Sequence, residues 1–166
     1  MRWAVIDSSV YIGHWERGLY EDALTTVRKA FIVRHSAVVL SELRRGARTR
    51  PAQRLVDALA ALARGPWEPT ADDWWEAGRL IRTIGDGQGW EIGKRREFQN
   101  DALIALTARR HGATVVTSNR DDFVLLSKAT GVRVLYAMEG RRTQLARTPF
   151  SLARAGSSAR AVGQPK

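Results

Sequence analysis

The stretch NDALIALTARRHGATVVTSNRDDF, residues 100–123, combines a helix pattern, a glycine and a strand pattern in direct succession. Asn100 is a favourable N-cap for the apolar helix that follows it, and Gly112 favours the end of that helix. The β-branched run at residues 113–117 then predicts a buried strand, and Asp122 opens a further short helix. Helices that alternate with strands in this way are typical of an α/β domain with a parallel sheet.

Short strands and helices alternate over most of the remaining chain. Three more apolar runs have the length of a buried strand, at residues 2–6, 32–35 and 132–136. The spacing of apolar side chains predicts helices at residues 10–31, 36–47, 51–64 and 71–84, whereas residues 85–97 indicate a charged, glycine-rich loop. We therefore predict one α/β domain over residues 1–140, with a central, mainly parallel sheet of about four to five short strands and helices on both faces. Residues 141–166 are predicted to form a basic, flexible tail.

The composition is that of a globular protein and excludes several other classes. A chain of 166 residues is long enough for one domain with a genuine core and too short for two. No apolar run approaches the ~20 residues that a membrane-spanning helix needs. The chain has no cysteine, which excludes disulfides and thiolate-bound zinc. The N-terminal segment lacks the apolar region and small-residue cleavage site of a signal peptide, so we expect a cytoplasmic location without membrane association.

The charge balance is strongly basic. The formal net charge is +10, and residues 141–166 account for +6 of it because they contain six basic residues and no acid. An excess of this size favours nucleic acid or another anionic partner through non-specific attraction. The alternative is a solubility effect combined with a general preference for arginine, which far outnumbers lysine in this chain.

Four acidic residues occupy positions where the predicted elements would ordinarily carry apolar or capping residues. They are, in chain order, Asp7, Glu42, Asp101 and Asp122. Asp7 ends the first strand and Asp122 follows the strand of residues 113–117, while Asp101 lies in the first turn of its predicted helix. Helix capping is an alternative role for these three aspartates. Glu42 borders the apolar face of its helix, where a carboxylate needs a cation or hydrogen bonds, and its alternative role is a surface ion pair with Arg45 or Arg48.

These carboxylates are expected to converge at one edge of the sheet. In an open parallel sheet, ligands bind beyond the carboxyl ends of the strands, which is where Asp7 is placed. Carboxylates that crowd together repel one another, and a hard divalent cation with oxygen ligands removes that penalty. A metal-bound water can act as a nucleophile, and the metal neutralises charge on a phosphate. With the basic balance of the chain, this pattern predicts a metal-dependent enzyme that acts on a polyanion.

Four segments together resemble the signature blocks of PIN-domain ribonucleases, and are most similar to those of VapC-type toxins from bacterial and archaeal toxin–antitoxin pairs. They are AVIDSSVYI (4–12), SELRRGA (41–47), NDALIALTARRHGATVVTSNRDDF (100–123) and VRVLY (132–136), in the family's order and at similar separations. The resemblance spans residues 1 to about 138. It implies a central parallel sheet, dependence on Mg²⁺ or Mn²⁺, cleavage of RNA (tRNA, rRNA or mRNA), a homodimer and inhibition by a cognate antitoxin.

The resemblance assigns the four acids to one catalytic and metal-binding site. Asp7, Glu42 and Asp101 match the family's first three acids, at the strand end, in the Glu-Leu-x-x-Gly helix and in the Asp-Ala-Leu-Ile helix. At the fourth position the pattern has Asn119, a neutral oxygen ligand at best, so the role falls to Asp122. We expect the three aspartates to hold the metal directly or through water, and Glu42 to bind it or to orient the attacking water.

Further residues are predicted to support the acids or to contact the substrate. Ser9, Thr117 and Asn119 are candidates to fix the carboxylates or touch phosphate, with ordinary capping and strand-end roles as the alternative. Trp90, in the predicted loop, is a candidate to stack on an unpaired base. A solvated surface run is the alternative for the basic residues 94–96. The basic candidates to meet the RNA backbone are Arg44, Arg45, Arg48, Lys94, Arg95, Arg96 and Arg120.

Two other functions stay open at this point. One is a catalytically inert PIN-like module that binds RNA or a protein, although such a module has no use for converging carboxylates. The other is a DNA-acting nuclease of the same fold. Histidine-based catalysis and a histidine zinc site are disfavoured, because His14, His35 and His111 are far apart in the sequence and lack metal-ligand spacing.

Overall fold

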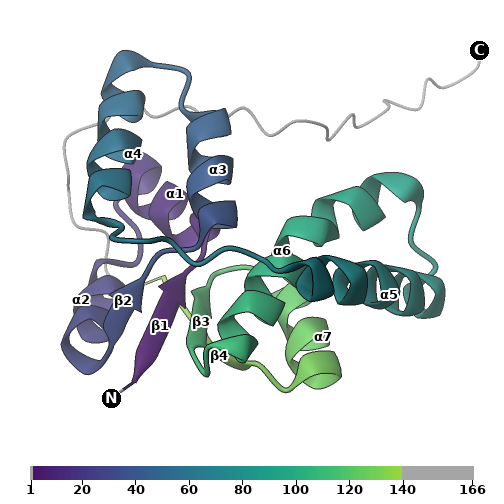
Figure 1. The fold of residues 1–166 in the computed structure, drawn as a ribbon. Coiled ribbons are helices and arrows are strands. Elements are labelled where there is room, and N and C mark those ends of the chain that lie inside the picture. Colours follow the sequence, from purple (N-terminus) through teal and green to yellow (C-terminus); the bar gives the residue numbers. More distant parts are fainter. Residues whose placement is uncertain (1, 140–166) are drawn as a thin grey trace, which may run out of the picture.

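A four-stranded sheet forms the centre of the protein (Figure 1). The structure is a computed structural model that describes residues 2–139. Its strands are β1 (Trp3–Ile6), β2 (Ile32–Arg34), β3 (Thr114–Thr117) and β4 (Arg133–Tyr136), in the spatial order β2-β1-β3-β4. All pairings between these strands are parallel, and the strands are those that the sequence predicts. The predicted α/β architecture is therefore confirmed.

The strand order changes direction between β1 and β3. From β1 the chain passes to one edge of the sheet at β2, and it then crosses back to β3 and β4 on the other side. In open α/β sheets, ligands bind beyond the carboxyl ends of the strands at such a switch point. Asp7 directly follows β1, and Asn119 lies two residues beyond β3. Two of the predicted site residues are therefore placed at the switch point by the sheet itself.

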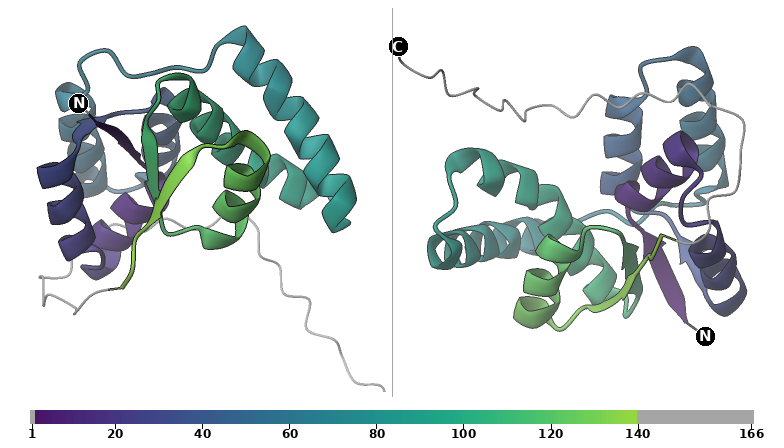
Figure 2. Two further views of the ribbon diagram at one scale, coloured as in Figure 1. Left: turned by 90° about the horizontal axis from the view of Figure 1, so that it is seen from below. Right: turned by 180° about the vertical axis from the view of Figure 1, so that it is seen from behind.

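Helices cover both faces of the sheet (Figure 1, Figure 2). The helices of the described residues are α1 (Ser8–Arg17), α2 (Glu21–Ala30), α3 (Ala37–Gly46), α4 (Arg50–Leu62), α5 (Ala71–Gln88), α6 (Ile92–Arg110) and α7 (Arg120–Thr130). The figures show α1 to α4 on one side of the molecule and α5 to α7 on the other. Both groups bury large apolar side chains, among them Leu24 and Leu43 on one side and Phe98 and Phe123 on the other.

Helix α6 lies at the centre of the α5–α7 group. Every residue from Ala102 to Ala108 is buried, because this half of the helix contacts α3, α5, α7 and β3. A helix that is apolar on all sides is typical of a core position. Asp101 immediately precedes the buried half, so its carboxylate is carried by one of the most firmly packed segments of the protein.

The glycine-rich segment predicted as a loop is mostly helical. Helix α5 continues through Gly85 to Gln88, and α6 already begins at Ile92, so the loop prediction for residues 85–97 is wrong. Gly85 leaves space for the Arg95 guanidinium, since a Cβ at residue 85 would lie 2.8 Å from Cζ of Arg95 in its present position. Close packing of the two helices therefore overrides the low helix propensity of glycine.

Two helix starts also differ from the prediction. Because α6 begins at Ile92, Asn100 lies inside the helix and caps nothing, and the first-turn explanation for Asp101 is wrong. Helix α7 begins two residues before Asp122, with Asn119 as its N-cap. The Asn119 side chain accepts a hydrogen bond from the backbone N–H of Asp122, so the capping role foreseen for Asn119 is present.

Two expectations concern the chain as a whole. The tail predicted at residues 141–166 lies outside the described residues. Between residues 2 and 139, no helix combines the length and the apolar character needed to cross a membrane.

Candidate active site

Asp7 lies at the carboxyl end of β1, and only 2% of its surface is exposed. Its Oδ2 accepts hydrogen bonds from Ser9 Oγ at 2.6 Å and from Thr117 Oγ1 at 2.8 Å. Asp7 occupies the N-cap position of α1 but makes no side-chain capping bond, so capping does not explain it. Its other oxygen, Oδ1, is buried and has no hydrogen-bond partner among the described residues. The sheet therefore presents one supported and one unpartnered carboxylate oxygen at this position.

Glu42 lies on α3, and two other helices hold its carboxylate. Ser8 Oγ of α1 donates to Oε2, and Asn100 Nδ2 of α6 donates to Oε1, both at 2.8 Å. None of the ion pairs within residues 2–139 includes Glu42, so neither Arg45 nor Arg48 pairs with it. The surface ion pair considered as an alternative is therefore not formed.

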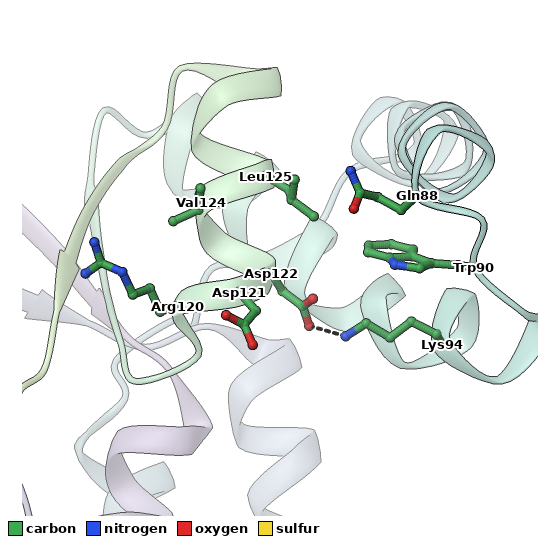
Figure 3. Close-up of a pocket in the computed structure, with 8 residues that line it drawn as sticks. All are labelled: Gln88, Trp90, Lys94, Arg120, Asp121, Asp122, Val124 and Leu125. Atoms are coloured by element: carbon green, nitrogen blue, oxygen red, sulfur yellow. Dashed lines mark hydrogen bonds and ion pairs between the residues drawn. The ribbon is translucent and has the colours of Figure 1, made fainter.

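Asn119 connects the two remaining acids. Its Nδ2 donates to Oδ2 of Asp101 at 2.8 Å and to Oδ2 of Asp122 at 3.0 Å. Lys94, from the first half of α6, forms an ion pair with the same Asp122 oxygen at 2.7 Å (Figure 3). The site thus combines one cation with acids from four different elements of the fold.

The acids of the site destabilise one another's charged forms. Burial raises the pKa of the Asp7 carboxyl, against the hydrogen bonds from its two hydroxyl partners and the smaller effect of the nearby backbone N–H groups of Ser8 and Ser9. Burial also raises the pKa of Glu42. The pKa of Asp101 lies well above its usual range, first because of burial and then because of the charges of Asp7, Asp122 and Glu42. A site with such raised pKa values favours the uptake of protons or of a cation.

The donor set fits a hard divalent cation, although the coordination sphere is not preformed. Carboxylate and amide oxygens suit Mg²⁺ and Mn²⁺, and Asp7 Oδ1 is a buried oxygen without a partner in the described part of the chain. Among residues 2–139, however, no group of three or more His, Cys, Asp or Glu side chains is arranged so that it could hold a metal ion. Lys94 Nζ and Asn119 Nδ2 both contact Oδ2 of Asp122. A cation bound at that oxygen competes with Lys94 for it.

The polar residues predicted to support the acids contact them directly. Ser9 and Thr117 donate to the Asp7 carboxylate, and Asn119 donates to the acids of α6 and α7. Thr117 Oγ1 also accepts a hydrogen bond from the backbone N–H of Asn119 at 3.0 Å, and Ser9 Oγ accepts one from the N–H of Ser118 at 3.1 Å. The same hydroxyls therefore fasten the loop after β3 and orient Asp7.

The arginines predicted to contact the substrate have different surroundings. Arg95 lies in α6 rather than in a loop, and its guanidinium donates to the carbonyl of Trp90 at 3.0 Å and pairs with an aspartate of α5 at 2.8 Å. These contacts make Arg95 a tie between α5 and α6. Arg96 is exposed on α6, and the Arg120 guanidinium lies 4.8 Å from the centre of the Tyr136 ring.

Sequence reasoning missed Ser8 and Asn100, which are the two residues that hold Glu42. It also missed the ion pair between Lys94 and Asp122. Lys94 precedes Asp101 by seven residues, which places both on the same face of a helix after about two turns. This spacing becomes informative only when residues 92–110 are recognised as one continuous helix. The wrong loop prediction therefore hid the contacts of Lys94 and Asn100 with the acids.

An open pocket of about 390 Å³ lies beside the acids (Figure 3). The Trp90 ring in its wall packs edge-to-face on Phe98 with ring centres 4.8 Å apart, and Lys94 Nζ lies 5.4 Å from the centre of the Trp90 ring. The lining residues are Gln88, Trp90, Lys94, Arg120, Asp121, Asp122, Val124 and Leu125. Because Lys94 and Asp122 belong to both, the pocket and the acidic site form one continuous surface.

Comparison with known proteins gives one family and one fold. The family model described as PIN domain matches residues 4–129. A chain in the structure of VapBC-5 from Mycobacterium tuberculosis, a member of the VapBC family of toxin–antitoxin systems, is 26% identical, with a TM-score of 0.55 over 82% of this chain and 99% of that one. No curated protein matches the chain.

Two further solved structures share the fold at lower identity. A chain of VapBC2 from Rickettsia felis, bound to a DNA fragment from the promoter, is 21% identical, with a TM-score of 0.58 over 81% of this chain and 98% of that one. A chain of VapBC-1 from nontypeable Haemophilus influenzae is 18% identical, with a TM-score of 0.60 over 81% and 97%. The resemblance expected from the sequence blocks is confirmed.

Proposed function

The chain belongs to the PIN domain family, and we propose that it is a metal-dependent endoribonuclease, the toxin of a toxin–antitoxin pair that blocks translation. The observation that carries this proposal is a group of acids at the switch point of the sheet, three of which have raised pKa values. A protein that only binds a partner gains nothing from partly burying carboxylates that repel one another. A nuclease uses the same arrangement to attract a cation and a phosphate.

We assign Mg²⁺ or Mn²⁺ to this site. Asp7, Asp101 and Asp122 would hold the cation, directly or through water, and Glu42 would bind it or orient the attacking water. When bound, the cation supplies a water of lowered pKa and neutralises charge on the scissile phosphate. The unpartnered Oδ1 of Asp7 and the oxygen donors of the site support the assignment.

The chain's own polar residues keep the carboxylates in place. Ser9 and Thr117 hold one oxygen of Asp7, which leaves the other oxygen available. Glu42 is held in the same way by donors from α1 and α6. Supporting partners of this kind typically contribute about 10–100-fold to metal affinity or activity.

The proposed substrate is RNA, hydrolysed at a phosphodiester bond. Lys94 touches the acidic site, Arg120 borders the adjoining pocket, and the formal net charge of the chain is +10. Basic side chains attract the phosphate backbone, whereas the acids alone would repel it. The combination supports a substrate that is a polyanion.

We further propose a cognate antitoxin as protein partner, a homodimer as assembly and the cytoplasm as location. Support for the antitoxin comes from the likeness to VapBC-5, which belongs to a family of toxin–antitoxin systems. A short reading frame next to the gene, encoding a DNA-binding protein, is the expected source. Co-expression of its product should relieve growth inhibition by this chain, and failure to do so would contradict the pairing.

Cleavage of tRNA and rRNA fragments tests the enzymatic proposal. We expect cleavage in Mg²⁺ or Mn²⁺ and none in EDTA, with single-stranded DNA and flap DNA assayed in parallel. Asp101→Asn should abolish cleavage, whereas Asp72→Asn, which removes an exposed acid at the start of α5, should leave it unchanged. Equal cleavage by Asp101→Asn and the parent would refute the catalytic assignment. Preferential cleavage of DNA would show that the chain is a DNA-acting nuclease and not a ribonuclease.

A further inference from the structure

The pocket beside Asp122 exposes apolar and aromatic surface next to an ionic site. Figure 3 shows Trp90 and Leu125 on opposite walls, with Trp90 after the end of α5 and Leu125 on α7. The neighbouring Val124 is 44% exposed. Packing on Phe98 fixes the Trp90 ring in place. Exposed apolar surface rimmed by polar groups marks interaction sites, so this pocket invites a ligand with a flat apolar face.

The polar groups of the pocket suit a nucleotide. The Gln88 amide offers two donors and an acceptor to the edge of a base. Lys94 lies between the pocket and the acids, 5.4 Å from the centre of the Trp90 ring and 2.7 Å from Oδ2 of Asp122. Arg120 adds a second cation to the lining. A nucleotide whose base sits in the pocket therefore has its phosphate beside Lys94 and the acidic site.

We propose that this pocket binds an unpaired base of RNA next to the phosphodiester bond that is cleaved. The inference rests on the proposed nuclease function and adds to it a specificity site formed by Gln88, Trp90 and Leu125. Proteins bind single-stranded nucleic acids by stacking bases on aromatic side chains and by basic contacts to phosphates, and both elements are present here. The volume of about 390 Å³ lies near the lower end of ligand pockets, which suits one nucleotide better than a helix of a partner protein.

The proposal has a direct consequence for the choice of substrate. A base in a duplex is stacked and paired on both sides, so it cannot enter the pocket without unpairing, which costs a few kcal/mol. Loops and single strands therefore become the preferred targets. Cleavage next to a paired base becomes slow even where the phosphate itself is accessible.

Abasic RNA tests the pocket without any change to the protein. In a series of otherwise identical loop substrates, single nucleotides around the mapped cleavage point are replaced by abasic residues that retain the phosphate. We expect one position next to the cleaved bond to lower kcat/KM by roughly 5- to 150-fold, the range of base–aromatic stacking. The other positions should change it little.

Two protein variants connect that position to the pocket. Trp90→Leu and Gln88→Ala should lower kcat/KM for the intact RNA and leave the abasic substrate unaffected, so that the difference between the substrates disappears. Gln88 is exposed, so Gln88→Ala decides the matter if Trp90→Leu melts early through lost packing on Phe98. The matched control is Gln99→Ala, which removes an exposed glutamine of α6 outside the pocket and should keep the parent profile.

RNA binding measured by fluorescence anisotropy in EDTA separates this inference from the nuclease proposal. Base-dependent binding without cleavage in metal keeps the base-binding pocket but refutes the nuclease, and with it the placement of the pocket beside a cleaved bond. If the RNA is cleaved but no abasic position changes kcat/KM, the pocket proposal is overturned and the nuclease proposal stands. The same holds if Gln88→Ala and Trp90→Leu show the same dependence of kcat/KM on abasic position as the parent. A pocket that instead receives a side chain of a partner protein would give these results. If the RNA is neither bound nor cleaved, both proposals are overturned.

Discussion

The two ends of the acidic site are built differently. At one end, Asp7 is buried between the ends of β1 and β3, and neutral hydroxyls of Ser9 and Thr117 hold one of its oxygens. At the other end, Asp122 lies on a helix, at the border of an open pocket, and its partner is the charged Lys94. The first end is held by short side chains of the sheet region, and the second by a long side chain from another helix.

The different partners of Asp7 and Asp122 determine which of the two carboxylates is ready to bind a cation. Neutral hydroxyl donors leave the charge of Asp7 uncompensated and its Oδ1 unpartnered in the described residues, so a cation gains there without displacing anything. The Lys94 ammonium already compensates Asp122, so a cation at that oxygen competes with it and Lys94 moves aside. Lys94 is 34% exposed and has a flexible stem, so this movement costs little.

Among changes at the two ends of the site, loss of the charge at Asp7 is expected to have the largest effect. Asp7→Asn keeps the shape of the side chain and an acceptor for the hydroxyl donors, but it removes the charge that binds the cation. We expect kcat/KM to fall by at least about a hundredfold, beyond the range for a supporting residue. Because burial opposes the Asp7 charge, the variant should be at least as stable as the parent in EDTA. Normal cleavage, or a lower melting temperature in EDTA, would contradict the account of this end.

A pair of buried threonines tests the hydroxyl support. Thr117 and Thr107 are 0% and 1% exposed, but only the Thr117 hydroxyl contacts Asp7, and Thr107 Oγ1 has no hydrogen-bond partner in residues 2–139. Thr117→Val should lower metal affinity or activity by about 10–100-fold, since it removes a donor from a buried carboxylate. Thr107→Val should leave activity unchanged and should not lower the melting temperature. Calorimetric titration with Mn²⁺ measures the affinity, and equal behaviour of the two variants would remove the special role of Thr117.

The stability of the metal-free protein is expected to fall as pH rises above about 4, the usual range of Asp and Glu. Asp7, Glu42 and Asp101 have pKa values raised by folding, so the folded state binds more protons than the unfolded state in the window between the two values. The favourable contribution is complete below the unfolded value and is lost as pH passes the raised one. Each raised pKa unit corresponds to about 1.4 kcal/mol.

Urea denaturation in EDTA at several pH values measures this slope. Saturating Mg²⁺ should flatten it, because a bound cation offsets the repulsion, and Asp101→Asn should flatten it in part without metal. A metal-free stability that climbs steadily from about pH 4 to 7 would show that the acids are not destabilised by one another.

The sheet and the acids were predictable from the sequence for a physical reason. Each strand is a short apolar or β-branched run, and Asp7 and Asp122 follow two such runs directly or closely. Glu42 was recognisable because a carboxylate at the border of an apolar helix face needs partners, and it has them in Ser8 and Asn100. Patterns of this kind are local, so they survive in a single sequence.

Segment 85–97 was not predictable, because its helices depend on contacts between them. Gly85 favours a loop by itself, yet in the structure it gives Arg95 the space to tie α5 to α6. Only this packing brings Lys94 onto the face of Asp101 and Trp90 into a pocket wall opposite α7. Local propensity contains no information about such contacts, and the part of the site that depends on them was hidden with them.

Replacing Lys94 is expected to have the smallest effect. It tests most directly whether the Asp7 end and the Asp122 end differ in their readiness to bind a cation. A partly exposed ion pair is worth about 0.2–1 kcal/mol, so Lys94→Gln should raise divalent-cation affinity by about 1.4- to 5-fold. The same change should weaken RNA binding at low salt and reduce its salt dependence by about one phosphate contact. Arg96→Gln, which removes an exposed charge two residues further along α6, should weaken RNA binding but leave the affinity for Mn²⁺ unchanged. If Lys94→Gln binds Mn²⁺ more weakly than the parent, then Lys94 holds Asp122 in position as the hydroxyls hold Asp7, and the two ends of the site are equally prepared for the cation.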